Sequence, residues 1–265
     1  MAIMGRHRSK MNSMALGRLF LLFLLSVSLA ACANTARLQE QAGNHIRVGT
    51  AYLGSVQYTS ALKEFLAAEK LTPDDPKIHY LLGISYHGKG LSDMAIVEFQ
   101  RALVLKPDDS EVHNYLGAIY MEKGLWDDAI ASFNRALANI LYDTPSASLY
   151  NLGRAYYEKR EYDLALKYYR DAVEKDPDNI LMPWIEKNIG MCRLAKGDTE
   201  EALRHFQKSL TLAPSLAESH YWLGLCYQKL KRQADAAAAF QSAIRLAPES
   251  EFGKKAKESL KNPIP

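Results

Sequence analysis

A set of apolar, small and aromatic residues recurs about every 34 residues along this sequence, and this spacing constrains the fold more than any other feature. In the segment 76–109 the set consists of Leu82, Gly83, Tyr86, Ala95, Phe99, Ala102 and Pro107. The members of each half lie three or four residues apart, so each half forms one face of a helix. Each unit is therefore predicted to be a pair of amphipathic helices, which is stable only when units stack and cover each other's apolar faces.

Small residues are predicted at the place where the two helices of a unit cross. Gly83 and Ala95 let the two backbones approach, and Phe99 fills the space beside them. Pro107, followed by two aspartates, ends the second helix and opens the turn into the next unit.

The arrangement resembles the tetratricopeptide repeat (TPR), and this resemblance implies an all-α, right-handed solenoid of helix-turn-helix repeats. Six repeats are predicted over residues 42–250, with a capping helix and tail over residues 251–265. The repeats span residues 42–75, 76–109, 110–145, 146–179, 183–216 and 217–250. The third repeat closes late, at Pro145, and a second insertion, residues 180–182, precedes the fifth repeat, in which Arg193 replaces the tyrosine and Ser209 the alanine.

The first 31 residues are predicted to be a signal peptide. Arg6, Arg8, Lys10 and Arg18 precede or adjoin an apolar run over residues 19–29, which is too short to span a membrane as a helix. Further methionines, Met4, Met11 and Met14, leave the true first residue open.

The end of this run, Leu29-Ala30-Ala31-Cys32, resembles the lipobox of bacterial lipoproteins. That resemblance implies cleavage before Cys32, lipidation of the cysteine and a membrane anchor, with residues 33–41 as a short polar tether. Ala33 stands where an aspartate would resemble the inner-membrane retention signal, so the resemblance implies the periplasmic face of the outer membrane. The alternative is an ordinary signal peptide that leaves Cys32 as a free thiol.

The charge of the chain excludes a general nucleic-acid-binding role. Removal of the four basic residues before Cys32 takes the formal net charge from +3 to −1. The mature chain is therefore predicted to have no basic face for nucleic acid.

Histidines and cysteines in this sequence are interpreted as packing residues. His45, His79, His113 and His220 all occupy the fourth position of their repeats, and equivalent positions are too far apart to share one metal ion. Cys192 and Cys226 share the tenth position, and stacked helices about 10 Å apart exceed the reach of a disulfide, so both are predicted to be buried reduced thiols. No metal and no cofactor are expected.

Catalysis has no convincing candidate in the sequence. Ser60 and Lys63 match the serine-x-x-lysine of penicillin-binding enzymes, but the lysine-threonine-glycine partner motif is absent and Ser60 adjoins the conforming Ala61. Neither a phosphate-binding glycine loop nor a His-Glu-x-x-His zinc motif occurs. The chain is therefore predicted not to be an enzyme.

The concave surface is the predicted binding site. In TPR folds the second, fifth, ninth and twelfth positions of each first helix face the inner groove. Here those positions include Tyr80, Ile84, His87, Asn114, Met121, Tyr150, Arg154, Tyr157, Trp184, Met191, Tyr221 and Leu225. Aromatic and methionine side chains with an arginine are typical of a protein-binding surface, although several of these tyrosines could instead pack between repeats and present only an edge.

The expected ligand of this groove is an extended or helical apolar segment. Thr50 and Ile84 occupy ninth positions, so the lysine and asparagine set of the chaperone-type carboxylate clamp is missing. Recognition of a free terminal carboxylate is therefore not expected.

A lipobox, six repeats and an added Tyr-x-x-Pro linker, Tyr142 to Pro145, together resemble the PilF/PilW lipoproteins of type IV pilus biogenesis. That resemblance implies a scaffold that binds a secretin subunit and supports secretin assembly at the outer membrane. Two alternatives remain: an adaptor lipoprotein that recruits peptidoglycan hydrolases or other envelope proteins, and a homodimer whose groove is filled by a neighbouring subunit.

Overall fold

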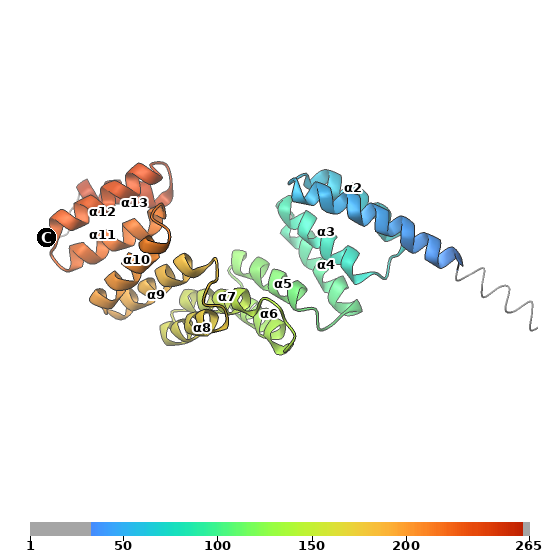
Figure 1. The fold of residues 1–265 in the computed structure, drawn as a ribbon, viewed down its shortest axis with the longest axis horizontal. Helices are drawn as coiled ribbons and strands as arrows, with labels where there is room; N and C mark the ends of the chain where they lie inside the picture. The colour runs from blue at the N-terminus through green and yellow to red at the C-terminus, as the bar shows by residue number, and fades with distance from the viewer. Residues whose placement is uncertain (1–32, 262–265) are drawn as a thin grey trace, which may run out of the picture. The chain divides into compact units, whose positions relative to one another are not determined.

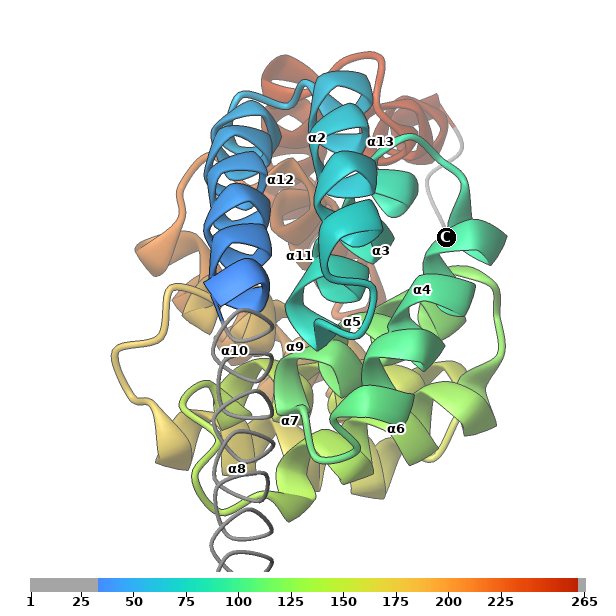
Figure 2. The same cartoon turned by 90° about the vertical axis from the view of Figure 1, so that its right-hand side faces the viewer.

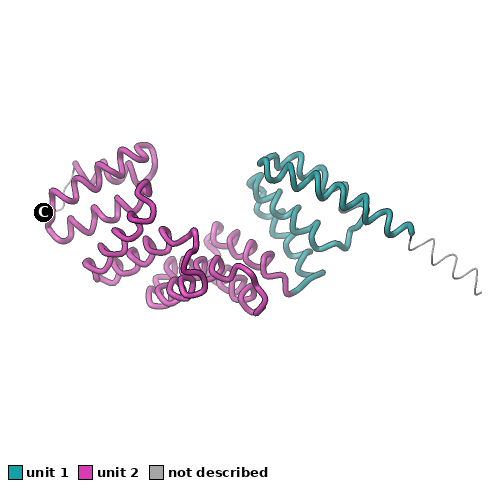
Figure 3. Tube along the Cα trace, viewed as in Figure 1, with its two compact units in different colours: residues 1–107 teal, residues 108–265 magenta. Residues whose placement is uncertain are grey.

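The structure is a computed structural model that describes residues 33–261, and every regular element among those residues is helical (Figure 1). The all-α prediction is confirmed for this part of the chain. The predictions for the signal peptide, for lipidation of Cys32 and for the last four residues lie outside the described residues. The chain divides into two compact units, residues 1–107 and residues 108–265, which are described separately (Figure 3).

The first unit contains two helix pairs. A helix over residues 33–54 and α2 (Tyr58–Leu71) form the first pair, and α3 (Pro76–Gly88) and α4 (Ser92–Leu105) form the second. The helix over residues 33–54 and α2 lie side by side (Figures 1 and 2), and their core joins Ala42 and Phe65 to Leu82 of α3. The first pair therefore shares its apolar core with α3, the first helix of the second pair.

Residues 33–41, interpreted above as a tether, are helical and continue into the first helix of the first repeat. The stretch contains Ala, Leu, Arg, Gln and Glu, which all favour helix, and it contains neither Gly nor Pro. The prediction of a polar tether did not include this helix, because exposed polar side chains are equally compatible with a helix surface.

The second unit contains the remaining helices in stacked pairs. They are α5 (Ser110–Glu122), α6 (Trp126–Ala138), α7 (Pro145–Glu158), α8 (Tyr162–Lys175), α9 (Met182–Lys196), α10 (Thr199–Leu212), α11 (Ala217–Lys229), α12 (Gln233–Leu246) and α13 (Glu251–Lys261). Each helix packs on the next one, and the first helices of neighbouring repeats, α5, α7, α9 and α11, also contact each other. This neighbour-to-neighbour packing is that of a helical solenoid, as predicted.

A glycine and an aromatic ring form the central contact of each helix pair. The pairs are Gly49–Phe65, Gly83–Phe99, Gly117–Phe133, Gly153–Tyr169, Gly190–Phe206 and Gly224–Phe240. A Cβ atom on any of these glycines would lie only 2.4–2.8 Å from the nearest ring carbon. The small residue is therefore required for close approach of the two helices, as predicted for Gly83 and Phe99.

A left-handed residue makes the turn inside several helix pairs. Gly90 and Gly124 have φ values of 76° and 71°, whereas Val56, Arg160 and Lys231 adopt φ values of 60°, 62° and 59° at the equivalent place. The three non-glycine residues carry a conformational cost that the two glycines avoid.

The helix α13 covers the apolar end of the second unit. It packs on α11 and α12, its Ala256 is fully buried, and its Phe252 ring lies 5.7 Å from the ring of Tyr221. The predicted capping helix is therefore present up to Lys261.

Two connections in the second unit are longer than the others. They are residues 139–144, before α7, and residues 176–181, before α9. Pro145, interpreted above as the end of the third repeat, is instead the first residue of α7, where a proline costs no hydrogen bond.

Candidate functional site

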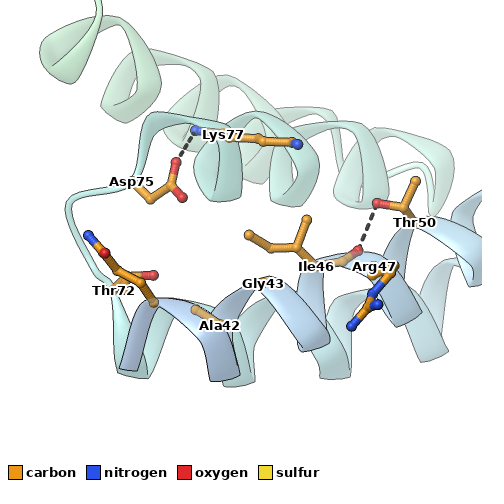
Figure 4. Close-up of a pocket in the computed structure, with 9 residues that line it drawn as sticks. Ala42, Gly43, Ile46, Arg47, Thr50, Thr72, Asp75 and Lys77 are labelled. Carbon is orange, nitrogen blue, oxygen red and sulfur yellow. Dashed lines mark hydrogen bonds between the residues drawn. The ribbon is translucent and has the colours of Figure 1, made fainter. Parts of the chain in front are cut away.

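The concave face of the first unit contains a pocket of about 620 Å³ (Figure 4). The helix over residues 33–54 forms one wall, and the connection between α2 and α3 with the start of α3 forms the other. Its lining residues are Gln39, Ala42, Gly43, Ile46, Arg47, Thr50, Thr72, Asp75 and Lys77.

The centre of this pocket is apolar. Ile46 points into the space opposite Lys77, and Gly43 beside it has no side chain to fill that space (Figure 4). A Cβ atom built on Gly43 would meet nothing within 4 Å. The pocket can therefore receive an apolar side chain from a partner.

The rim of the pocket favours negative charge. The Asp75 carboxylate accepts a 2.9 Å hydrogen bond from the backbone N–H of Lys77 and is engaged in capping α3, while the Lys77 and Arg47 side chains are exposed. Two cations and one engaged carboxylate suit a ligand that carries an acidic group beside its apolar side chain.

The pocket contains groove positions that the sequence prediction did not single out. Gly43, Ile46 and Thr50 occupy the second, fifth and ninth positions of the first repeat, and Lys77 the second position of the next. The search for aromatic and methionine residues passed over them, although the same position rule locates them. Tyr80 and Ile84, which were predicted, are half-buried on α3, and the Tyr80 ring packs 6.1 Å from that of Phe99.

In the second unit, Tyr150 is the centre of one group of predicted groove residues. Its hydroxyl accepts a 3.3 Å hydrogen bond from the Asn188 side chain, and its ring lies 6.0 Å from that of Tyr169. The exposed Arg154 guanidinium lies 5.8 Å from the Tyr150 ring centroid. These contacts hold Tyr150 firmly and leave Arg154 as the accessible charged group.

Asn114 has a structural role that the prediction did not include. Its side-chain oxygen accepts a 2.9 Å hydrogen bond from the Ser148 hydroxyl and so connects α5 to α7. It is half-buried at the concave face, where it helps to join two neighbouring repeats.

Trp184 is the most open of the predicted aromatic groove residues in the second unit, with 37% of its surface exposed. On the same helix, Lys187 forms a 2.7 Å ion pair with Glu218 of α11, and the lysine side chain is 9% exposed. Met191, one turn further on, packs on the cluster that contains Phe206 and Cys226. Trp184 and Met191 thus flank a mostly buried ion pair that connects two repeats.

Tyr157, Tyr221 and Leu225 lie half-buried at the same face. The Tyr221 ring contacts Trp222 at 5.5 Å and Phe240 at 5.9 Å, and the Tyr157 ring contacts Tyr162 at 5.6 Å. Burial raises the pKa of Tyr157 to about 12, and it also raises the pKa values of Tyr150 and Tyr221. These tyrosines are therefore only partly accessible to a ligand.

An acid–histidine contact joins the two helices of several repeats, and among the described residues it is buried on both sides only in the second repeat. His45 contacts Glu64 at 2.7 Å and His79 contacts Glu98 at 2.8 Å, with the histidine on the first helix in both cases. In the fifth repeat the two residue types are exchanged, because Glu186 on the first helix contacts His205 on the second at 2.7 Å. These pairs were not predicted from the sequence, because residues 19 positions apart face each other only when the two helices of a repeat are packed together.

Glu69, His79 and Glu98 place their ligand atoms within 4.8 Å of one another, which is compatible with binding a cation. The three groups already have partners: His79 donates to the Pro73 carbonyl at 2.9 Å, and Arg101 lies 3.0 Å from Glu98 and 3.7 Å from Glu69. A metal ion would have to displace Arg101, so the group is well explained as an ionic network.

Glu186 is a buried acid with two cationic neighbours. It is 3% exposed, and Lys208 lies 2.6 Å from its second oxygen. Burial alone would raise the pKa of Glu186, but hydrogen bonds from His205 and Lys208 outweigh that effect and hold the pKa below its usual value.

Cys192 and Cys226 are free and fully buried thiols, as predicted. Burial raises the pKa of each to about 12. Both side chains therefore act as small packing groups rather than nucleophiles.

Stacked helix pairs with accessible concave faces define this chain as a helical repeat protein of the kind that binds other proteins. Over residues 33–261, no helix combines the length and apolarity needed to cross a bilayer. Four family models, described as tetratricopeptide repeat or TPR repeat, match the chain. One of them matches twice, at residues 108–178 and 147–215, and the other three match residues 49–90, 76–109 and 189–251. The chain belongs to the tetratricopeptide repeat proteins.

Curated relatives match only part of the chain. The photosystem I assembly protein Ycf3 of Acaryochloris marina is 31% identical over 96 residues, which are 36% of this chain and 58% of Ycf3. The protein CTR9 homolog of Arabidopsis thaliana is 29% identical over 108 residues, which are 40% of this chain and 10% of that protein. The chain thus spans less than two thirds of the length of either relative.

Similar solved structures cover most of the chain. Pseudomonas aeruginosa PilF has a TM-score of 0.72 and 17% identity, with 84% of this chain and 99% of PilF aligned. PilW, a widely conserved type IV pilus biogenesis factor, has a TM-score of 0.74 and 21% identity, with 82% of this chain and 98% of PilW aligned. YrrB, a TPR protein with an unusual peptide-binding site, has a TM-score of 0.56 and 22% identity, with 73% of this chain and 97% of YrrB aligned. At these identities the likeness is one of fold.

Proposed function

We propose that this protein is a non-enzymatic scaffold lipoprotein of type IV pilus biogenesis, which binds a secretin subunit at its concave faces during secretin assembly. The observation that carries the proposal is the fold match to PilF and PilW, which extends over 98–99% of those proteins and 82–84% of this one. A match over nearly the whole length of both partners favours a shared scaffold role more than a match to isolated repeats does.

The concave face supports a protein ligand. The pocket beside Gly43 combines an apolar centre with two cations, and Trp184 offers a partly exposed aromatic surface in the second unit. Such combinations of apolar anchors and polar rims are typical of peptide recognition.

The anchor remains a prediction from the lipobox-like sequence at Cys32. Lipidation there would hold the scaffold at the periplasmic face of the outer membrane and raise the local concentration of a bound secretin subunit at the membrane. Cys32→Ser is expected to preserve fold and binding but to release the protein from the membrane fraction. A serine variant that fractionates with the membrane as wild type does would refute the anchor.

The test of the assembly role is the amount of heat-resistant secretin multimer in outer membranes from cells with and without this gene. Loss of multimers with accumulation of monomers is the expected result. Unchanged multimers would refute the pilus role and would favour an adaptor for other envelope proteins.

The test of the pocket uses two glycines of one helix. Gly43→Leu places a side chain in the pocket, whereas Gly54→Leu is a matched control, because Gly54 also has nothing within 4 Å of its Cβ position and does not line the pocket. We expect Gly43→Leu to weaken co-purification of the secretin subunit by about tenfold, and Gly54→Leu to leave it unchanged. Equal effects of the two substitutions would exclude the pocket as the binding site.

A further inference from the structure

The two lengthened connections of the second unit contain the same turn. Both have the sequence Asn-Ile-Leu, at residues 139–141 and 179–181. In each, the asparagine side-chain oxygen accepts a hydrogen bond from the leucine N–H two residues later, at 3.0 Å for Leu141 and 2.7 Å for Leu181. The asparagine carbonyl accepts a second bond from the residue after the leucine, at 3.1 Å and 2.9 Å. These bonds define the same asparagine-stabilised turn twice.

This turn projects its isoleucine into solvent. Ile140 is 95% exposed and Ile180 is 84% exposed. Leu141 adds a further side chain that is 80% exposed. Large aliphatic side chains gain substantially from burial, so two adjacent turns of this kind form a candidate contact surface.

Both turns are held in place by the helices around them. The Asn179 side chain donates a 2.7 Å hydrogen bond to the Ser146 hydroxyl in the first turn of α7, which directly follows the first connection. Tyr142 is 9% exposed, and its hydroxyl lies 3.4 Å from the Ser148 hydroxyl, to which it can donate a hydrogen bond because the Ser148 proton is used by Asn114. The isoleucines are therefore presented on ordered backbone, which lowers the entropy lost on binding.

The two turns lie next to each other on one edge of the unit. Each precedes the first helix of a repeat, and these two helices, α7 and α9, contact each other. The Asn179–Ser146 hydrogen bond also ties the second turn to the start of α7, directly after the first turn. One partner surface can therefore contact both.

The charge around the isoleucines identifies the kind of partner. The connections contain Asp143, Asp176 and Asp178, and the only basic residue that directly adjoins them in the sequence is Lys175 at the end of α8, so acidic groups predominate. Acidic residues beside the apolar tips disfavour an anionic membrane surface and favour a protein surface with basic side chains.

We propose that the two Asn-Ile-Leu turns form a docking surface that inserts Ile140 and Ile180 into an apolar cleft of a protein partner whose rim carries Lys and Arg. The surface is separate from the concave face, because none of its residues lies in the groove positions. It is therefore independent of the proposed secretin role, and either can fail without the other.

The test places a photo-cross-linking residue at Leu141 in the full chain, in cells that naturally produce the protein. Ile140→Ser/Ile180→Ser removes both tips, and Val104→Ser is the matched control, because Val104 is an aliphatic residue of α4 that is 81% exposed. We expect an adduct with one partner protein whose cross-linked peptide borders an apolar cleft with basic residues. The yield should fall about tenfold in the double serine variant and stay unchanged in Val104→Ser.

Further measurements distinguish a protein partner with basic residues from a second copy of this chain and from a lipid surface. Asp143→Asn/Asp178→Asn, or ~0.5 M NaCl during cross-linking, is expected to lower the yield several-fold. Three results would overturn the proposal: an adduct yield that ignores the isoleucines, an adduct between two copies of this chain, or flotation of the purified protein with phosphatidylcholine vesicles that depends on Ile140 and Ile180. Thermal unfolding followed by circular dichroism checks that the exposed substitutions leave the fold intact. If the serine variant does not fold, the aspartate variant and the salt dependence still decide the outcome.

Discussion

Glycine-to-alanine substitution is predicted to have opposite effects on stability at two helical positions, one in contact with an aromatic ring and one with open space beside it. A Cβ atom on Gly117 would lie 2.6, 2.8 and 2.9 Å from three ring carbons of Phe133, whereas a Cβ atom on Gly43 would meet nothing within 4 Å. Gly117→Ala should therefore destabilise the protein, and Gly43→Ala should stabilise it. Both positions are helical, so the local helix preference is matched.

The magnitude follows from the geometry. Carbon atoms in contact lie about 3.5–4.0 Å apart, so the Phe133 ring or the helix must shift by ~1 Å to accommodate Gly117→Ala. Phe133 is fully buried, and overpacking of this kind costs about 1–3 kcal/mol. Alanine recovers ~1 kcal/mol of helix preference, which leaves a net loss of up to ~2 kcal/mol for Gly117→Ala. Gly43→Ala has no steric term and should gain up to ~1 kcal/mol.

Urea and thermal unfolding followed by far-UV circular dichroism would measure the two effects. We expect the unfolding temperature to fall by up to about 8 °C for Gly117→Ala and to rise by a few degrees, ~2–4 °C, for Gly43→Ala. Phe133→Leu should remove most of the cost of Gly117→Ala in a double-mutant cycle, because the ring that clashes is gone. If Gly117→Ala stabilises the protein as much as Gly43→Ala does, the contact is not the steric constraint described above.

Three other predictions concern the turns and the buried groups. Lys231→Gly should stabilise the protein by ~0.5–1 kcal/mol in urea unfolding, because it relieves a left-handed backbone that Gly90 adopts without strain, and no gain would contradict the assigned turn. Cys192 and Cys226, with folded pKa values of about 12 and a reference value of 9.0, favour folding below about pH 9, and that contribution is lost as the pH rises towards 12. At pH 8 both thiols should react with Ellman's reagent at least about a hundredfold faster after unfolding, and fast reaction of the native protein would refute their burial. Glu186, whose pKa is lowered on folding, contributes stability above about pH 4.5 that is lost as the pH falls through its folded pKa, so Glu186→Gln should flatten the acid limb of a pH–stability curve and an unchanged limb would exclude this role.

The helix pairs could be predicted from the sequence because their spacing reflects local geometry. Gly83, Ala95 and Phe99 identify the crossing point of one pair, and the structure places them there. The capping helix was predictable for the same reason, since the last repeat would otherwise expose an apolar face.

The features that the sequence did not reveal depend on contacts between helices. The exchanged pair of Glu186 and His205 became recognisable only when positions 19 residues apart were seen to face each other. The helical character of residues 33–41 was missed because polarity was taken to mean a tether, although the residues there favour helix. No residue type in the sequence indicated the pocket beside Gly43, because the defining feature of this pocket is the absence of a side chain. The groove residues and the lipid anchor remain predictions, and Cys32→Ser tests the anchor.

The exchanged histidine and glutamate of the fifth repeat have a consequence for how similar helices find their correct neighbours during folding. A hybrid of the first helix of the second repeat with the second helix of the fifth would place His79 against His205. The reverse hybrid would place Glu98 against Glu186, two buried acids that keep Arg101 on the Glu98 helix but lose both histidines and Lys208. Each crossed pairing therefore loses the acid–histidine contact, and the acid–acid pairing also gains a repulsion, whereas each native pairing keeps an acid beside a base. The second and fifth repeats share one sequence pattern but place histidine and glutamate in opposite order. This difference disfavours pairing of a helix from one repeat with a helix from the other.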